Sequence, residues 1–357
     1  MAYSRRDFGK MMLSSVPMAT GFGTTFGSPG LLRALVARSD FVVNGIRLGT
    51  ISFSFKELKK TVGEAQWPEV LGDCQQCGLS NLEIEIAKVE PIRTLTGGGG
   101  ARAAVVEVPA AVTTLYGTAY VAPVGVPRAA AAPPASPMTP EDQAAAKAVR
   151  EEIRQFRVTA PATYYANIKK QANAAGININ AYTCGWGSDY TDAEIDAVFL
   201  AAKALGAVAI NSSTTLEMAK RLAPFADKHQ FQVAFHGHLF GLFSNSDDYA
   251  STLALSRYFR INLDVGHFTA ACGDAVAFIK LNHDKLPSIH MKDYKMAGGR
   301  SMSWGQGDSP IKPVMQLLKA LRYPGVVTIE YDYPIPAGSN SIAEVEKCRL
   351  YLQEALA

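Results

Sequence analysis

Short apolar runs alternate with helical patterns along the chain from about residue 41 onward. Segments rich in Ala, Leu and Lys, with apolar positions three or four residues apart, lie between most of these runs, as in Asp192–Leu205, Thr215–His229 and Ile311–Leu321. Eight repeats of a strand followed by a helix predict a (β/α)8 TIM barrel. The eight expected strands are Ile46–Phe53, Asn81–Ala87, Ile177–Tyr182, Ala207–Ser212, Gln232–His238, Ile261–His267, Ser288–Lys292 and Val326–Tyr331.

An insertion, residues 91 to about 140, interrupts this alternation after the second predicted strand. It holds the glycines 97–100 and an Ala/Pro tract, residues 128–137. No Lys-Ser/Thr pair follows the glycines, so a flexible linker is favoured over a phosphate-binding loop. Because it leaves from the carboxyl end of a strand, the face on which barrels build active sites, it could overhang a pocket. Thr139 and Pro140 predict the cap and the first residue of the following helix.

The first 40 residues have a different character. Arg5 and Arg6, with Phe8 and Lys10 behind them, precede the mildly apolar stretch Met11–Phe26, which contains no acid and is rich in Gly, Ser and Thr. This pattern is typical of a twin-arginine export signal. We therefore expect residues 1–40 to be a signal and spacer, the twin-arginine machinery to place the protein in the periplasm or outside the cell, and residues 41–357 to form the barrel.

Composition narrows the class of protein. Of the 357 residues, 48% are hydrophobic and 19% charged, which allows a full-sized core. The 35 Lys and Arg against 32 Asp and Glu give a formal net charge of +3, and no basic stripe indicates nucleic acid as a partner. No run reaches the roughly 18 to 20 apolar residues that span a bilayer, and the five Cys are too few for a disulfide scaffold. We expect a globular protein without stable membrane insertion, and homo-oligomerisation stays open.

Polar residues recur on one parity of the predicted strands, and residues two apart in a strand share a face. The apolar parity must face the surrounding helices of a parallel barrel, so the polar parity lines the interior. Its ionisable members stand at the carboxyl ends of the strands and are expected to meet at one mouth. The polar parity consists of Asn81, Glu83, Glu85, His236, His238, Asn262, Asp264, Ser288, His290, Lys292, Thr328 and Glu330.

Acids and imidazoles that are buried together require mutual pairing, water or a cation. Two imidazoles and two carboxylates form a suitable ligand set for a divalent ion such as Mn²⁺, Co²⁺, Zn²⁺ or Mg²⁺. The expected metal ligands are therefore His236, Asp264, His290 and Glu330. The alternative interpretation is an internal network of ion pairs and hydrogen bonds in a metal-free pocket.

Further polar residues near the predicted mouth have two interpretations each. His238 and His267 could orient a substrate or shuttle a proton, or they could support the metal ligands. Glu83 or Glu85 could reach a substrate hydroxyl, with one of the two paired to a cation such as Lys292. Lys292 could protonate an oxyanion, or it could neutralise the acid that follows it in the chain.

Other reactive side chains have structural interpretations. His229 and His283 lie in polar helix or loop contexts, which predicts solvated imidazoles. Cys74 and Cys77 match a redox spacing, but they lie on a predicted helix outside any thioredoxin-like unit. Burial as small core residues is therefore favoured for both cysteines.

Five segments carry a resemblance to a known family: Gly78–Glu83, Leu263–His267, Ile289–Asp293, Trp304–Asp308 and Ile329–Tyr331. They resemble the sugar phosphate isomerase/epimerase group of the xylose isomerase-like barrels. That superfamily also includes tagatose 3-epimerase-type enzymes, inosose dehydratases and AP endonucleases. The resemblance implies metal ligation by Asp264, His290 and Glu330, with His267 near the substrate. It covers the chain from residue 41 onward apart from the insertion.

The fifth predicted strand departs from the epimerase pattern. Epimerases usually place there a Glu that binds the metal and acts as one of two opposed carboxylate bases, whereas this chain has His236. A proton exchange between two carboxylates is therefore not implied, and the His-x-His arrangement of His236 and His238 is more similar to the dehydratase-like branch. AP endonucleases need a richer set of metal ligands and a DNA-binding surface, and this sequence shows neither.

The predicted site suits chemistry next to a carbonyl group. A divalent ion on a carbonyl oxygen and its neighbouring hydroxyl would acidify the C–H between them and stabilise an enediolate, with Glu330 as the base and His238 or His267 returning a proton. Return to carbon gives a sugar isomerase or epimerase, the leading expectation. Loss of a β-oxygen gives a keto-sugar lyase or dehydratase, and a non-catalytic periplasmic carbohydrate-binding protein is a further alternative. For an exported chain, free, oxidised or glycosidic sugars are the expected small-molecule partners.

Overall fold

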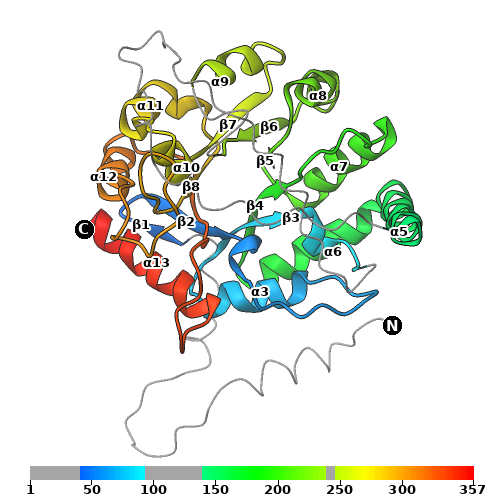
Figure 1. The fold of residues 1–357 in the computed structure, drawn as a ribbon, viewed down its shortest axis with the longest axis horizontal. Helices are drawn as coiled ribbons and strands as arrows, with labels where there is room; N and C mark the ends of the chain where they lie inside the picture. The colour runs from blue at the N-terminus through cyan, green and yellow to red at the C-terminus, as the bar shows by residue number, and fades with distance from the viewer. Residues whose placement is uncertain (1–40, 93–138, 239–245) are drawn as a thin grey trace, which may run out of the picture. The chain divides into compact units, whose positions relative to one another are not determined.

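A computed structural model describes residues 41–92, 139–238 and 246–357. Each parallel strand pairs with the next one along the chain, and β9 pairs with β2, so the strands close into an eight-stranded barrel (Figure 1). A short strand, β1 (Val42–Val43), pairs antiparallel with β2. The predicted TIM barrel is confirmed. Its parallel strands are β2 (Ile46–Ile51), β3 (Asn81–Glu85), β4 (Asn178–Thr183), β5 (Ala209–Ser212), β6 (Gln232–His236), β7 (Phe259–Asp264), β8 (Ser288–Met291) and β9 (Val326–Ile329).

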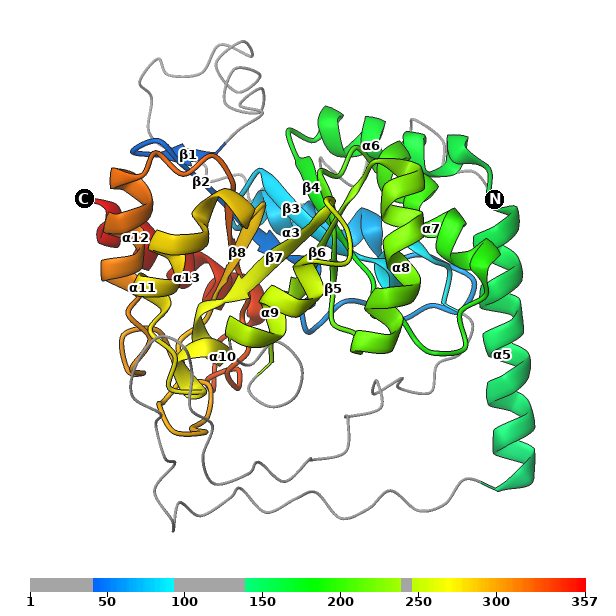
Figure 2. The same ribbon diagram turned by 90° about the horizontal axis from the view of Figure 1, so that it is seen from above.

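Helices surround the barrel strands (Figures 1 and 2). Within the described ranges, none is both long and apolar enough to cross a membrane. The helical elements are η1 (Ser52–Ser54), α3 (Trp67–Gln76), α4 (Ile86–Val89), α5 (Pro140–Thr159), α6 (Ala162–Ala174), α7 (Asp192–Leu205), α8 (Leu216–His229), α9 (Ser246–Leu253), α10 (Val265–Ala270), α11 (Ala275–Asn282), η2 (His283–Lys285), α12 (Ile311–Ala320) and α13 (Ser341–Leu356).

Both faces of the barrel strands are buried, as the parity argument predicted. Apolar side chains such as Ile84 and Leu263 belong to the core cluster that the helices share. The opposite parity is equally buried, although it carries polar residues such as Glu83, Asn262 and Ser288. The interior of this barrel is therefore polar, and its hydrogen bonds must be satisfied by side chains.

The helix start at residue 139 is confirmed. The Thr139 hydroxyl accepts the backbone N–H of Asp142 at 3.1 Å, the Asp142 carboxylate accepts the backbone N–H of Thr139, and Pro140 is the first helical residue. Most of the insertion, residues 93–138, and the expected export signal in residues 1–40 lie outside the described residues, so both interpretations stay predictions.

Six strands end one to three residues earlier than the sequence suggested, and the largest difference is at the end of β7. The apolar run up to His267 predicted a strand, but β7 stops at Asp264 and His267 belongs to α10. The Asp264 Oδ1 atom accepts the backbone N–H of His267 at 2.9 Å and so caps that helix. A side chain expected on the strand therefore stands on the first turn of a helix.

The interpretation of His229 as solvated is wrong. Its side chain is buried on the inner face of α8, its ring stacks on Phe199 with centroids 5.0 Å apart, and Nε2 lies 2.7 Å from Asp196 Oδ1. Cys74 and Cys77 are free and buried, as predicted, and burial raises the pKa of the Cys77 thiol to about 12.

Gly49 marks a point where β2 and β3 approach too closely for a side chain. A Cβ atom at this position would lie 2.6 Å from the Asn81 carbonyl oxygen and 3.0 Å from Val326 Cγ1. We expect Gly49→Ala to lower the free energy of unfolding by about 1–3 kcal/mol, measured by urea denaturation. In the control Gly72→Ala, the new Cβ on α3 meets nothing within 4 Å, so a gain of about 0.5–1 kcal/mol is expected. Equal stability of Gly49→Ala and the parent would contradict this close packing.

Candidate metal centre and active site

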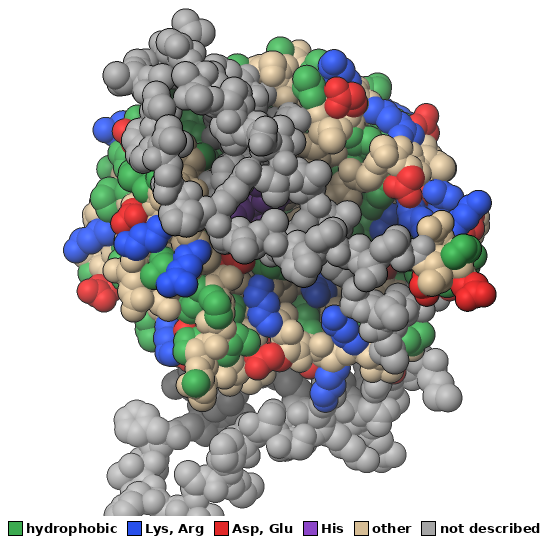
Figure 3. All heavy atoms as spheres, in the orientation of Figure 1, with side chains coloured by type: hydrophobic (Ala, Val, Ile, Leu, Met, Phe, Trp, Pro, Cys, Tyr) green, Lys and Arg blue, Asp and Glu red, His purple; other side chains and the backbone are tan. Residues whose placement is uncertain are grey.

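The four expected ligands lie together at the carboxyl ends of four consecutive strands. His236 ends β6, Asp264 ends β7, His290 lies in β8 and Glu330 follows β9. In register, Asp264 pairs with His290 across the two strands. One ligand atom from each of the four buried side chains lies within 4.8 Å of the other three. Histidine atoms are visible near the middle of the face shown in Figure 3.

His290 lies between two carboxylates. Its Nε2 atom is 2.7 Å from Glu83 Oε2, and its Nδ1 atom is 2.7 Å from Glu330 Oε2. Burial alone would lower the pKa of His290, but the two carboxylates outweigh burial and raise this pKa to about 10. Without a metal, His290 is therefore an imidazolium. To act as a ligand it must lose one proton, and Glu83 would keep the other on Nε2, which leaves Nδ1 free.

Lys292 neutralises the carboxylates at the mouth. Its Nζ atom lies 2.8 Å from Glu330 Oε1, 3.2 Å from Asp264 Oδ2 and 3.6 Å from Asp332 Oδ2. Burial opposes the charge on Lys292, but these carboxylates raise its pKa well above the usual value. Burial would likewise raise the pKa values of Asp264 and Glu330, yet the nearby cations, Lys292 among them, hold both well below the usual range. All three groups are therefore charged near neutral pH.

One buried acceptor in this cluster lacks a directed hydrogen bond. Asp264 Oδ2 has His267 Nδ1 at 2.9 Å and His236 Nε2 at 3.5 Å, besides Lys292. None of these contacts has the geometry of a hydrogen bond in the described part of the chain. His236 Nδ1 lies 2.7 Å from Asn262 Oδ1 and donates to it, so Nε2 carries a lone pair. A buried carboxylate oxygen without a directed donor, beside a free imidazole lone pair, fits a divalent cation.

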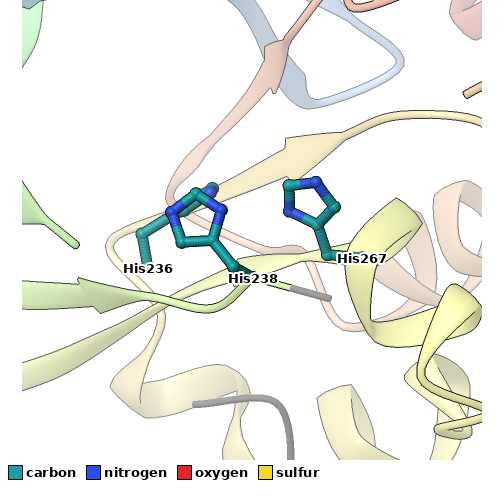
Figure 4. A group of neighbouring side chains, drawn as sticks. All are labelled: His236, His238 and His267. Atoms are coloured by element: carbon teal, nitrogen blue, oxygen red, sulfur yellow. The ribbon is translucent and has the colours of Figure 1, made fainter. Parts of the chain in front are cut away.

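A second group of histidines lies at the rim. Figure 4 shows His236 and His238 at the end of β6 and just beyond it, with His267 on α10 facing them. The ring centroid of His238 is 5.0 Å from that of His236 and 5.2 Å from that of His267. His238 is exposed at the rim, yet partial desolvation of its ring by nearby protein atoms, together with the neighbouring His267 and Lys292, lowers its pKa to about 4. His238 is therefore neutral, and its Nε2 contacts Ser213 Oγ at 2.8 Å.

Glu83 and Glu85 have different surroundings. Besides its contact with His290, Glu83 accepts hydrogen bonds from Thr183 Oγ1 and from Asn211 Nδ2 at 2.7 Å. The cation that pairs with Glu83 is thus His290 and not Lys292. Glu85 accepts from Ser52 Oγ at 3.0 Å, and burial raises its pKa. Glu83 therefore supports His290. Glu85 is the carboxyl group at the mouth that can still accept further hydrogen bonds.

Lys292 does not neutralise the acid that follows it. The Asp293 carboxylate accepts the backbone N–H groups of Gly305 and Gly307, both at 2.8 Å, and of Ser309 at 3.3 Å. A Cβ atom at position 307 would collide with Asp293 Oδ1. Asp293 therefore holds the loop after β8, and the charge of Lys292 pairs with the carboxylates at the mouth instead.

The sequence pattern did not identify two residues of the mouth, Tyr294 and Asp332. The Tyr294 hydroxyl donates to Asp332 Oδ2 and lies 3.2 Å from His267 Nε2. Tyr294 and Asp332 stand two residues beyond Lys292 and Glu330, on the same parity. Continuing the alternation past the ends of the strands would have found both.

Comparisons with known proteins agree with the observed barrel. A family model described as xylose isomerase-like TIM barrel matches residues 137–351. No curated protein matches the sequence. Solved structures match the fold across most of the chain at low sequence identity.

Three of these solved structures show the level of similarity. An L-ribulose 3-epimerase has 12% identity and a TM-score of 0.52, covering 87% of this chain and 94% of its own. The IolI protein with a bound zinc atom has 11% identity and a TM-score of 0.52, and the match covers 87% of this chain and 97% of the IolI chain. The probable 3-DHS dehydratase AsbF from Bacillus anthracis has 10% identity and a TM-score of 0.52, covering 85% and 98%.

The charge on His290 makes stability depend on pH in the metal-free protein. Its folded pKa of about 10 exceeds the unfolded value of about 6.5, so its stabilisation is complete below pH ~6.5 and is lost as pH rises through 10. Over that interval the group lowers the free energy of unfolding by up to about 1.4 kcal/mol per pH unit.

Urea denaturation with a chelator, compared between the parent and His290→Gln, measures this contribution. The parent should lose stability more steeply with rising pH than the variant, because the variant has no group to titrate at this position. Parallel pH profiles for the two proteins would show that His290 is neutral in the folded state.

Proposed function

The chain belongs to the xylose isomerase-like TIM barrel family, and we propose that it is a metal-dependent sugar isomerase or epimerase. The reaction begins with removal of a proton from the carbon next to a carbonyl group. One observation carries the proposal: two imidazoles and two carboxylates from four strands meet within 4.8 Å at the mouth of the barrel. The L-ribulose 3-epimerase among the structural neighbours supports the reaction class.

A divalent cation fits this site. The residues that would hold it are His236, Asp264, His290 and Glu330, while Asn262 and Glu83 fix which imidazole nitrogens are free, as the partners of metal-bound histidines do. A bound cation supplies Lewis-acid polarisation of the substrate carbonyl, which acidifies the adjacent C–H. Zinc in the IolI protein supports a divalent metal in this chain, with Mn²⁺, Co²⁺ and Mg²⁺ as the other candidates for the same donors.

Glu330 is the proposed base. Its carboxylate is ionised, because Lys292 and His290 hold its pKa well below the usual range. A carboxylate with so low a pKa is a weak base, so abstraction requires a C–H that an adjacent carbonyl has already acidified. This favours keto-sugars over unactivated sugars. His267 would return the proton, because the neutral imidazole of His238 is too weak an acid for this step. The Lys292 ammonium, 2.8 Å from Glu330, would stabilise negative charge on a substrate oxygen.

Elimination is the second candidate reaction. At the end of β6 the chain carries His236 and, just beyond it, His238, with His267 facing them, rather than a second carboxylate base. An imidazole that protonates a departing β-oxygen would turn the same first step into dehydration or glycoside cleavage, and the dehydratase among the structural neighbours supports this branch. We further propose export by the twin-arginine machinery, which would bring free or glycosidic sugars to the site.

Replacement of the base gives a direct test. We expect Glu330→Gln to lower deuterium exchange at the carbon next to the carbonyl by at least about 100-fold, because a general base contributes roughly 10²–10⁴ in rate. Exchange is followed by NMR in heavy water with a panel of keto-sugars and metal-loaded protein. The control Glu217→Gln, on an exposed position of α8, should exchange like the parent.

The products of the parent protein separate the candidate reactions. Exchange without elimination supports the isomerase or epimerase, and elimination supports the lyase. Binding without either would leave a carbohydrate-binding protein. Unchanged exchange in Glu330→Gln would remove Glu330 as the base.

Metal content tests the ligand set. We expect His236→Ala to weaken metal binding by at least about tenfold, since even the supporting residues of metal sites contribute 10–100-fold to affinity. Elemental analysis after dialysis against graded chelator measures it. The control His283→Ala, in η2 away from the mouth, should retain metal like the parent. Full occupancy in His236→Ala would show that another group completes the coordination.

A further inference from the structure

An exposed aromatic ring lies at the mouth outside the proposed metal site. The short helix η1 directly follows β2, so its middle residue, Phe53, stands at the carboxyl ends of the strands with the candidate site. Phe53 is 40% exposed. A partly exposed aromatic ring beside a cluster of polar groups is a typical contact surface for a ligand.

Hydrogen bonds from its neighbours in the chain hold the backbone of Phe53 next to the segment that carries Glu330. The Ser54 hydroxyl accepts the backbone N–H of Tyr331 at 3.0 Å and donates to the Ile329 carbonyl oxygen at 3.2 Å. The Thr50 hydroxyl donates to the same carbonyl at 3.0 Å. Because Ile329 and Tyr331 flank Glu330, these bonds fix the position of Phe53 relative to the proposed base before any ligand binds.

A cation without an ion-pair partner lies on this ring. Lys56 Nζ is 3.3 Å from the centroid of the Phe53 ring and 5.9 Å from that of Tyr331. In the described ranges, no carboxylate oxygen lies within 4.0 Å of this ammonium. Burial lowers the pKa of Lys56 to about 8 against the opposing effect of Asp332 and Glu330, so the ammonium is within electrostatic reach of the site.

An acceptor completes this part of the mouth. Glu85 Oε2 is anchored by Ser52 Oγ at 3.0 Å, and the same hydroxyl accepts the Glu85 backbone N–H at 3.0 Å. No hydrogen bond to Oε1 comes from residues that the structure describes. The Glu85 carboxyl group also contributes to the electrostatic surroundings of Lys56.

We propose that Phe53, Lys56 and Glu85 form a subsite for a second sugar ring, joined by a glycosidic bond to the sugar that reacts. The apolar C–H face of this ring packs on Phe53, and its hydroxyl groups donate to Glu85 and accept from Lys56. Lys56 leaves the face of Phe53 and exchanges a cation–π contact for these hydrogen bonds. The inference rests on the proposed function and names its substrate class: glycosides, in preference to free monosaccharides.

Binding measurements test the subsite without relying on turnover. The full chain, loaded with metal, is titrated by calorimetry with cellobiose, maltose and lactose, and with glucose and galactose as the matching single rings. For the parent we expect at least one disaccharide to bind about tenfold more tightly than its monosaccharide. Phe53→Ala should remove this advantage and leave the monosaccharide affinity unchanged.

Two further variants test the role of the acceptor and provide a control. Glu85→Gln preserves the shape of the side chain but weakens its acceptor, so it should reduce only the disaccharide affinity. Leu281→Ala removes an apolar side chain that is 64% exposed on α11, away from η1, and should bind both sugars like the parent.

The outcomes separate this inference from the proposed function. Equal affinities of the parent for each disaccharide and its single ring, or equal losses for both in Phe53→Ala, would remove the subsite and leave the proposed reaction standing. If the metal-loaded parent binds none of the five sugars, the subsite is rejected, while deuterium exchange with free keto-sugars still tests the proposed reaction by itself.

Discussion

The compensation of buried charge at the mouth of the barrel is the constraint on which the rest of the structure depends. Helices cover the outside of every parallel strand, so the polar parity has no alternative to the interior. An ion moved out of water costs several kcal/mol unless it is paired. Here the Lys292 ammonium lies between Asp264 and Glu330, and the His290 imidazolium lies between Glu83 and Glu330. These pairs allow carboxylates at the end of a closed barrel.

The two interpretations of the polar cluster, an internal ion network and a metal site, describe one set of residues in two states of charge. Glu83 supports His290 in both, and Asn262 orients His236 in both. Asp264 Oδ2 is surrounded by nitrogens without a directed hydrogen bond, so it is the acceptor that a metal would satisfy better than the present neighbours do. A cation that enters would take over the charge now supplied by the second proton of His290. This exchange makes metal affinity depend on pH.

The alternation of polar and apolar residues was enough to predict the eight strands, the inward parity and the four residues that meet at the mouth. It could not predict where a strand stops, because the cap that Asp264 provides to α10 depends on a single side-chain contact. Tyr294 and Asp332 were missed because they lie beyond the strand ends. Phe53 and Lys56 carry no periodic signal, and their meeting depends on the turn of η1 after β2. His229 was misjudged because the polar residues around it concealed its place on the inner face of α8.

Anomalous diffraction from crystals grown with Mn²⁺ or Zn²⁺ tests the central claim most directly. The account predicts one ion at the mouth, bound by His236, Asp264, His290 and Glu330 at about 2.0–2.3 Å, with Lys292 displaced from at least one of the two carboxylates. Crystals grown at saturating metal in which no ion is present at these residues, and Lys292 still bridges Asp264 and Glu330, would contradict it.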